Sequence, residues 1–304
     1  MKTLIIGGTG MIGAHIAQHL VDQGQQITLG ARKPLAADHP LGHLPVLLGD
    51  YAEGGFTPQE MAGFDAVVFA AGNDIRHVAA GTDRDAFWRK MQIEGVPAFV
   101  ARAKAAGVGR LVQLGSYYHQ VMPELAARDD YVRARKLADE GARDLAGEGF
   151  NVTTLNPPSI VGISPGVSAK RYKGLVEWAL GKRPEIPDYA PAGGTNYMSV
   201  RSLVEAVSGA LQHGQSGTAY LIGDENLSFR DFFQKLFTAA GSTRPLEERD
   251  QEHPILPDAF IVPGRGVRLA YQTDPAEDAL LGYRKNDVDS ALATIVAQIN
   301  QGWG

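Results

Sequence analysis

The stretch that decides the fold is Lys2–Gly13, with the sequence KTLIIGGTGMIG. A short apolar run, Thr3–Ile6, is followed at once by glycines spaced G-x-G-x-x-G from Gly8, and then by a helical pattern of apolar residues. Because glycines lack a Cβ, such a turn lets the backbone approach a pyrophosphate closely at a helix N-terminus. The order of strand, turn and helix predicts a dinucleotide-binding site at Gly7, Gly8, Thr9, Gly10, Met11, Ile12 and Gly13.

The same alternation of short apolar runs and helical patterns continues through the first half of the chain. Strands that are buried on both faces of a parallel sheet are apolar nearly throughout, as these runs are. The further predicted strands are Gln26–Leu29, Val46–Leu48, Ala66–Ala70, Arg110–Leu114 and Val152–Leu155. The predicted helices are Ile12–Asp22, Asp85–Ala106 and Asp130–Glu148. Together they predict an α/β protein with a doubly wound parallel sheet, a Rossmann fold.

The pattern changes after about residue 157, where Gly, Pro and Ser become dense. We therefore expect a dinucleotide-binding Rossmann domain at 1–156, with parts of 195–225 returning to it. Residues 157–304 are expected to form a smaller, mainly substrate-binding region. Two helix starts can be located from capping chemistry alone: Thr57 with Glu60, and Ser228 with Asp231.

Composition excludes several classes of protein. The 304 residues include 29 Lys and Arg, 34 Asp and Glu, and no Cys. Without cysteine there is no disulfide, thiolate metal site or cysteine nucleophile. A formal net charge of −5 is atypical of a nucleic-acid-binding protein. The apolar N-terminal run is too short for a signal peptide, and no run approaches the roughly 20 residues needed to span a bilayer. We expect a cytoplasmic protein with neither a nucleic-acid nor a membrane partner.

No metal site is expected either. His15 and His19 have a spacing that could bind a metal, but no third ligand lies near them in the sequence.

The end of the second predicted strand bears on the choice of cofactor. NAD-preferring sites usually place Asp or Glu there to bind the ribose hydroxyls. The segment Leu29–Lys33 contains no acid, and Arg32 and Lys33 could meet a 2′-phosphate. The sequence therefore predicts NADP, with NAD as the alternative.

Beyond these local patterns, the chain resembles the extended short-chain dehydrogenases/reductases, the NAD(P)-dependent epimerase/dehydratase family, over almost its whole length. The resemblance rests on the glycine turn and on further motifs along the chain. These are Gly49-Asp50, Ala70-Ala71-Gly72, Gly115-Ser116, Lys136-Leu137-Ala138-Asp139-Glu140, Asn156-Pro157 and Gly223-Asp224-Glu225-Asn226-Leu227-Ser228.

The resemblance implies roles for individual residues. Around the cofactor it assigns Asp50 to the adenine amino group, Tyr51 to the side of the adenine, and Lys136 to the nicotinamide ribose. It also assigns Ala70, Ala71, Gly72 and Pro157 to the cofactor site. At the reacting centre, Ser116 would hold the substrate carbonyl and Tyr131 would exchange the proton, while the nicotinamide exchanges the hydride.

The spacing of the catalytic pair departs from the family pattern, in which a lysine follows the tyrosine by four residues. Tyr131 and Lys136 are five residues apart, which places them about 140° apart around an ideal helix. Three arrangements fit the sequence. A distorted first turn could bring Tyr131 to Lys136. Arg135 could replace the lysine. Or the pair is lost, and a different acid such as Tyr117, Tyr118 or His119 serves instead, or none does.

Two functions follow from these alternatives. The first is an NAD(P)-dependent oxidoreductase, or a sugar-nucleotide epimerase or dehydratase, that transfers a hydride between NADP and a carbonyl or alcohol, with Ser116, Tyr131 and Lys136 as catalytic residues. Its substrate would be a small carbonyl or alcohol compound or a nucleotide sugar, and a homodimer is left open. The second is a non-catalytic or atypical nucleotide-binding regulatory protein on the same fold. Candidate substrate contacts in the second half are Tyr172, Trp178, Tyr189, Asn196, Arg265 and Arg268.

Overall fold

The structure is a computed structural model that describes residues 1–35, 39–164 and 167–303. It divides into two compact units. The first consists of Met1–Pro157, Val204–Ile222 and Asp274–Tyr283, and the second of Pro158–Leu203, Gly223–Thr273 and Arg284–Gly304. The segment that rejoins the first unit, Val204–Ile222, lies within the predicted 195–225, and a further segment, Asp274–Tyr283, belongs with it.

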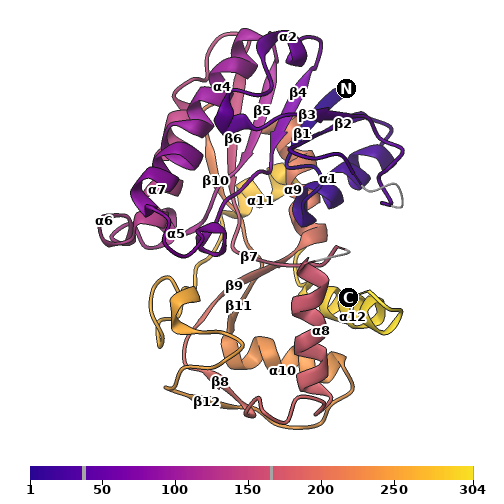
Figure 1. Ribbon diagram of the computed structural model, residues 1–304, viewed down its shortest axis with the longest axis vertical. Helices are drawn as coiled ribbons and strands as arrows, with labels where there is room; N and C mark the ends of the chain where they lie inside the picture. The colour runs from indigo at the N-terminus through magenta and orange to yellow at the C-terminus, as the bar shows by residue number, and fades with distance from the viewer. Residues whose placement is uncertain (36–38, 165–166, 304) are drawn as a thin grey trace. The chain divides into compact units, whose positions relative to one another are not determined.

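A seven-stranded parallel sheet forms the centre of the first unit (Figure 1). Its order is β10-β6-β5-β4-β1-β2-β3. The strands are β1 (Lys2–Ile6), β2 (Gln26–Ala31), β3 (Val46–Leu48), β4 (Ala66–Phe69), β5 (Arg110–Leu114), β6 (Asn151–Asn156) and β10 (Ala219–Leu221). All six predicted strands are present, and the doubly wound Rossmann fold is confirmed. The short strand β10 was not predicted.

The order of the strands creates a crevice beside β1. From β1 the chain proceeds to β2 and β3 on one side, and then returns to place β4 on the other side. Ligands of open parallel sheets bind outside the carboxyl ends of the strands at such a reversal. The carboxyl ends of β1 and β4 carry the glycine turn and the Ala70–Gly72 segment.

Helices cover both faces of this sheet (Figure 1). On one face, α4 (Gly95–Ala105) and α7 (Asp130–Arg143) share an apolar cluster with the sheet. Representative members are Leu4, Val67, Phe69, Phe99 and Ala138, all 2% exposed or less. On the other face, α1 (Met11–Asp22) packs against β1 and β2.

The segment predicted as one helix over Asp85–Ala106 is divided. It consists of α3 (Arg84–Trp88), a π-helical stretch (Arg89–Ile93) and α4. A Cβ on Gly95 would lie 2.1 Å from the carbonyl oxygen of Lys90, so the wide turn needs a glycine there. Such a turn leaves no mark in a pattern of apolar residues, and the prediction of a continuous helix was wrong for that reason.

The second unit has its own core. A three-stranded sheet in the order β11-β9-β7 and a two-stranded sheet, β12-β8, accompany three longer helices. The strands are β7 (Ser159–Val161), β8 (Tyr189–Pro191), β9 (Gly194–Ser199), β11 (Glu225–Ser228) and β12 (Glu247–Arg249). The helices are α8 (Val167–Ala179), α10 (Phe229–Ala239) and α12 (Val288–Asn300). The side chain of Ser228 accepts the N–H of Asp231, which confirms the predicted start of α10.

The remaining helices and 3-10 turns complete the fold. They are α2 (Pro58–Met61), α5 (Tyr118–Val121), α6 (Leu125–Arg128), α9 (Val200–His213), α11 (Pro275–Leu281) and the 3-10 turns Tyr51–Glu53, Ile75–His77 and Asp258–Phe260. The capping box predicted at Thr57 and Glu60 opens α2. Within the described ranges, no helix is long and apolar enough to cross a membrane.

Candidate functional site

Two glycines of the turn after β1 are required by packing. Gly7 has a φ of +78°, and a Cβ on it would lie 2.9 Å from the nitrogen of Ala71 and 3.0 Å from the carbonyl oxygen of Ala70. A Cβ on Gly13 would lie 2.2 Å from the carbonyl oxygen of Gly7. The turn is therefore packed directly against the end of β4, and its shape depends on these glycines.

Gly10 has a different environment. It is the exposed N-cap residue of α1, and a Cβ there would meet only the Gly7 carbonyl oxygen, at 3.3 Å. No side chain in the described part of the chain caps this helix. An uncapped N-terminus behind an exposed glycine leaves backbone N–H groups and space for an anionic group. The predicted turn, including Thr9, Met11 and Ile12, thus fits a bound pyrophosphate.

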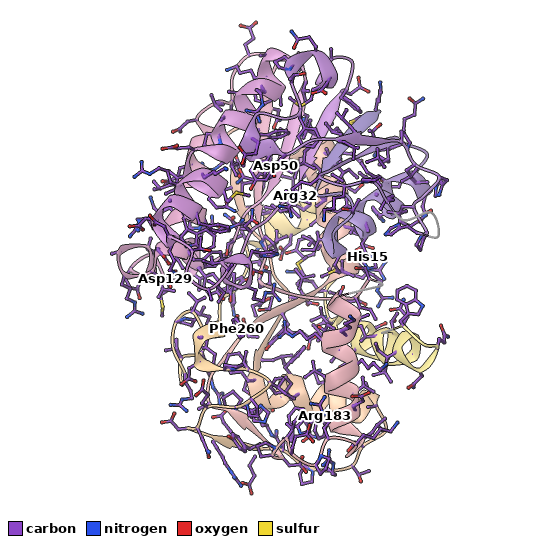
Figure 2. All side chains as sticks on the ribbon, in the orientation of Figure 1. His15, Arg32, Asp50, Asp129, Arg183 and Phe260 are labelled. Atoms are coloured by element: carbon purple, nitrogen blue, oxygen red, sulfur yellow. The ribbon has the colours of Figure 1, made fainter. Side chains whose placement is uncertain are left out.

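The ends of β2 and β3 bring a basic and an acidic residue to the same edge of the sheet. The turn is joined to β2 by the N–H of Gly7, which donates to the carbonyl of Gly30 at 2.9 Å. Arg32 and Lys33 follow β2 and are exposed. Asp50 caps the next 3-10 turn, where one carboxylate oxygen accepts the N–H of Ala52 at 3.0 Å. Figure 2 labels Arg32 and Asp50 near each other, and both charges influence the phenol of Tyr51.

Tyr51 lies in the core of the unit, which differs from the position that the resemblance implied. Its side chain is 6% exposed, and its ring meets that of Phe69 edge to face at 4.9 Å. The hydroxyl donates to the carbonyl of Met91 at 2.8 Å and accepts from Asn73 at 2.9 Å. Burial raises the pKa of Tyr51 to about 12. Packing and hydrogen bonds therefore fix the position of the ring in the core.

The segment after β4 connects the glycine turn to α7. Ala70 and Ala71 contact Gly7, as described above. A Cβ on Gly72 would lie 3.6 Å from Nη1 of Arg135 on α7. The three residues expected to line the cofactor path thus run from the proposed phosphate end to the proposed catalytic end.

Tyr131 and Ser116 are brought together, as the sequence predicted. The helix α7 begins after Asp129, labelled in Figure 2, whose side chain accepts the N–H of Val132 at 2.9 Å. Tyr131 is in the first turn and 8% exposed, and the Ser116 side chain is close enough to its phenol to lower the phenol pKa. Ser116 follows β5 and is 5% exposed. The helix is regular from Asp130, so this contact requires no distorted first turn.

Lys136 does not join this pair. Its Nζ donates to both carboxylate oxygens of Glu140, at 2.7 and 2.8 Å, and its side chain is 38% exposed. The expectation that Lys136 lies beside Tyr131 is not met, because a five-residue step on a regular helix turns the two side chains to different faces.

Arg135 occupies the position beside Tyr131 instead. It follows Tyr131 by one helical turn and is 6% exposed. Its Nη2 donates to the carbonyl oxygens of Leu114 at 2.9 Å and Gly115 at 2.5 Å, and its Nη1 lies 3.4 Å from Oε1 of Gln92. The sequence left this substitution open as one of three arrangements, and it is the one that the geometry matches.

The electrostatic surroundings keep the Tyr131 phenol protonated. Burial raises the pKa of Tyr131, the positive charge of Arg135 lowers it, the carboxylate of Asp74 raises it, and the hydrogen bond with Ser116 lowers it. The net shift is upward. A phenol that keeps its proton at neutral pH, beside a permanent cation that stabilises its anion, is suited to donate a proton.

The alternative acids do not share this arrangement. Tyr117 is 3% exposed, and its ring lies 4.3 Å from that of Tyr118. His119 is buried, with Nε2 3.1 Å from a carboxylate oxygen of Asp139.

Pro157, which the resemblance assigned to the cofactor site, is buried directly after β6.

The sequence did not predict the contacts of three further residues near the site. Gln92 is fully buried in the π-helical stretch beside Arg135, while Asp139 and Asn156 are fully buried behind Ser116. Asp139 could have been found, because Tyr131, Arg135 and Asp139 follow one another at four-residue intervals on one helix face.

The aromatic substrate contacts expected in the second unit belong to its core. Trp178 is fully buried beside Phe237, and Tyr189 is 3% exposed, with its hydroxyl donating to the carbonyl of Glu252 at 2.6 Å. Tyr172 is 8% exposed.

The polar candidates of that unit have partners of their own. Arg265 pairs with Asp250 and Asp258, Arg268 pairs with Glu248, and Asn196 donates to Asn226.

Comparisons with known proteins agree with the fold and the glycine turn. A protein of Synechocystis sp., named as a dihydroflavonol 4-reductase, is 26% identical over 270 residues, which are 79% of this chain and 73% of that protein. The UDP-glucose 4-epimerase of Stenotrophomonas maltophila, solved with NAD and a formylated UDP-arabinopyranose, has a TM-score of 0.71 and 18% identity, covering 99% of both chains. A human epimerase family protein solved with NADPH has a TM-score of 0.68 and 18% identity, covering 98% of this chain and 99% of that one.

The family itself is established by a model of the NAD dependent epimerase/dehydratase family, which matches residues 3–223. This match covers well over half of the chain and includes the glycine turn, Ser116, Tyr131 and Arg135. The chain therefore belongs to the NAD dependent epimerase/dehydratase family and is an NAD(P)-dependent enzyme of the short-chain dehydrogenase/reductase type.

Proposed function

We propose that this enzyme reduces a carbonyl compound with NADPH, and that Tyr131 is its general acid. The observation that carries this proposal is the buried guanidinium of Arg135 one helical turn from Tyr131, with the Ser116 side chain beside the same phenol. The phenol, whose pKa lies above its ordinary value of 10.0, is protonated at neutral pH, which is the form that a reduction needs. The relative named as a dihydroflavonol 4-reductase supports a carbonyl substrate.

Each residue has a distinct part in the proposed reaction. The nicotinamide, when bound along Ala70–Gly72, supplies the hydride. Ser116 donates a hydrogen bond to the substrate carbonyl oxygen and so holds it next to the phenol. Tyr131 delivers its proton to that oxygen, and Arg135 stabilises the resulting phenolate. Burial of both hydroxyls keeps bulk water away from the transferred proton.

The preference for NADP rests on the end of β2. Arg32 and Lys33 are exposed beside the glycine turn, and no acid is present in Leu29–Lys33. A carboxylate there would repel the 2′-phosphate, whereas a guanidinium can bind it through two parallel hydrogen bonds.

We expect Arg32→Ala to remove most of the preference for NADPH over NADH. The loss of a charge-assisted contact should weaken NADPH binding by about 1.5–3 kcal/mol, while NADH binding changes little. Calorimetric titration of both cofactors into both proteins measures this. Since Arg32 is exposed, the variant should keep its thermal stability. Equal affinity of the wild type for the two cofactors would contradict the assignment.

The competing function is a nucleotide-binding protein without turnover. Its motivation was the displaced lysine, and the position of Arg135 beside Tyr131 weakens it. Incubating the protein and NADPH with a panel of aromatic and aliphatic carbonyl compounds separates the two functions. Oxidation of NADPH that depends on the carbonyl compound supports an enzyme, whereas stoichiometric binding without oxidation supports the regulatory protein. A UDP-sugar series in the same assay tests for an epimerase.

A further inference from the structure

A buried carboxylate lies behind the Ser116 turn and has no part in the reaction proposed above. Asp139 of α7 is fully buried. Its oxygens accept hydrogen bonds from Nε of Arg143 at 2.7 Å and from Nδ2 of Asn156 at 3.3 Å, and one lies 3.1 Å from Nε2 of His119. Burial raises its pKa, but the hydrogen bonds from His119 and Arg143 and the charge of Arg143 outweigh this effect and lower it to about 2. Asp139 is therefore ionised and can only accept hydrogen bonds.

Asn156 links this carboxylate to Ser116. Its amide oxygen accepts the backbone N–H of Ser116 at 2.8 Å. Its amide nitrogen faces Asp139 and also donates to Oε1 of Gln120 at 2.8 Å. With an obligatory acceptor on one side and a backbone donor on the other, only one orientation of the amide satisfies both. The Ser116 N–H and the Asp139 carboxylate therefore favour the same orientation, in which the amide oxygen of Asn156 faces Ser116.

The neighbouring glycine fits this arrangement. A Cβ on Gly115 would lie 1.9 Å from the amide oxygen of Asn156. No other residue type at this position would let Asn156 reach the Ser116 N–H along the observed path. The close approach explains why a glycine directly precedes Ser116.

The face of α7 that carries the proposed proton donor holds this turn at three points. Tyr131 lies beside the Ser116 side chain, which lowers the pKa of the Tyr131 phenol. Arg135 donates to the carbonyl oxygens of Leu114 and Gly115, the two residues before Ser116. One turn further on, Asp139 orients the amide that holds the Ser116 N–H. Residues at four-residue intervals share a helix face, so one helix determines the positions of the donor, the cation and the serine.

We propose that Asp139 and Asn156 are positioning residues for the reaction: the carboxylate orients the Asn156 amide, which holds the Ser116 hydroxyl against Tyr131 and the substrate oxygen. The proposal rests on the proposed function, because it assigns these residues to the same site. Neither residue touches the substrate. They act by fixing the position of Ser116.

Kinetics of Asp139→Asn and Asn156→Ala test the proposal. Asp139→Asn removes the charge that strengthens the hold on the Asn156 amide, and Asn156→Ala removes the acceptor of the Ser116 N–H altogether. We expect both variants to lower kcat at least about tenfold, with NADPH affinity within about twofold of wild type. The alkaline limb of kcat should move to higher pH, because the hydrogen bond from Ser116 lowers the pKa of Tyr131.

A matched control separates positioning from stability. Asp287 in the second unit is also a buried carboxylate, 6% exposed, that holds Arg201 and Ser199. Asp287→Asn should lower the melting temperature while leaving kcat and its alkaline limb near those of wild type. If Asp139→Asn and Asn156→Ala behave like this control, the network is structural only and the proposal is wrong.

A structural readout keeps the proposal testable without activity. In a crystal structure of Asn156→Ala, which removes the acceptor of the Ser116 N–H, we expect Ser116 to move away from Tyr131. An unchanged position of Ser116 would overturn the proposal even in an active enzyme. The proposed function fails separately, if Tyr131→Phe keeps its activity.

Discussion

Replacing Tyr131 with Phe should lower the rate of NADPH-dependent carbonyl reduction by about 10²- to 10⁴-fold, the range over which a positioned proton donor acts. The ring is buried beside Trp88 at 5.3 Å, and phenylalanine preserves that packing. The variant should therefore fold and bind NADPH like the wild type. Single-turnover oxidation of bound NADPH, followed by its absorbance, measures the change without contribution from product release.

Tyr118→Phe is the matched control for this variant. The ring of Tyr118 lies 6.2 Å from that of Tyr131, so it removes a hydroxyl from the same cluster. We expect its rate to remain close to that of the wild type. A Tyr131→Phe enzyme as active as the Tyr118→Phe enzyme would show that the proton comes from another group.

Gly10→Val should abolish cofactor binding while leaving the fold intact. A Cβ at this position meets only one carbonyl oxygen, so the protein itself accommodates a side chain there. The two methyl groups of the valine would occupy the space through which a pyrophosphate must approach the N-terminus of α1. Calorimetry with NADPH and thermal unfolding without it measure the two effects separately.

Gly13→Ala serves as the comparison, because it disturbs the packing of the turn itself. Its Cβ would lie 2.2 Å from the Gly7 carbonyl oxygen, so the turn and α1 must move apart. Overpacking of this kind costs about 1–3 kcal/mol of the free energy of unfolding. Native NADPH affinity in Gly10→Val would contradict the placement of the cofactor at this turn.

The fold could be predicted from sequence because its elements have strong local patterns. The β1 segment is apolar, ends at glycines, and is followed by a helical period, and the capping residues Thr57 and Ser228 lie at the starts of α2 and α10. The features that were missed have weak local signals. Strand β10 is only three residues long, and the π-helical turn at Arg89–Ile93 depends on one backbone contact of Gly95.

The site was harder to predict, because sequence motifs do not say which way a side chain points. Alignment with the family motif favoured Lys136, yet the start of α7 at Asp130 places Arg135 beside Tyr131 and Lys136 beside Glu140. Likewise, Tyr51 follows Asp50 as the family pattern requires, but its hydroxyl has partners in the core. Helix phase and burial decide these assignments, and both depend on tertiary packing.

The pH dependence of kcat in two variants tests the central claim, that Tyr131 donates the proton with Arg135 as its cation. Arg135→Met removes the positive charge that lowers the pKa of Tyr131, whereas Lys136→Met removes a charge that is paired with Glu140. We expect Arg135→Met to reduce kcat at least about tenfold, or 1.4 kcal/mol, and to move its alkaline limb to higher pH. Lys136→Met should match the wild type in both respects, and NADPH affinity measured alongside shows that each site is intact. The opposite result, an unchanged Arg135→Met enzyme and a shifted or inactive Lys136→Met enzyme, would contradict the account.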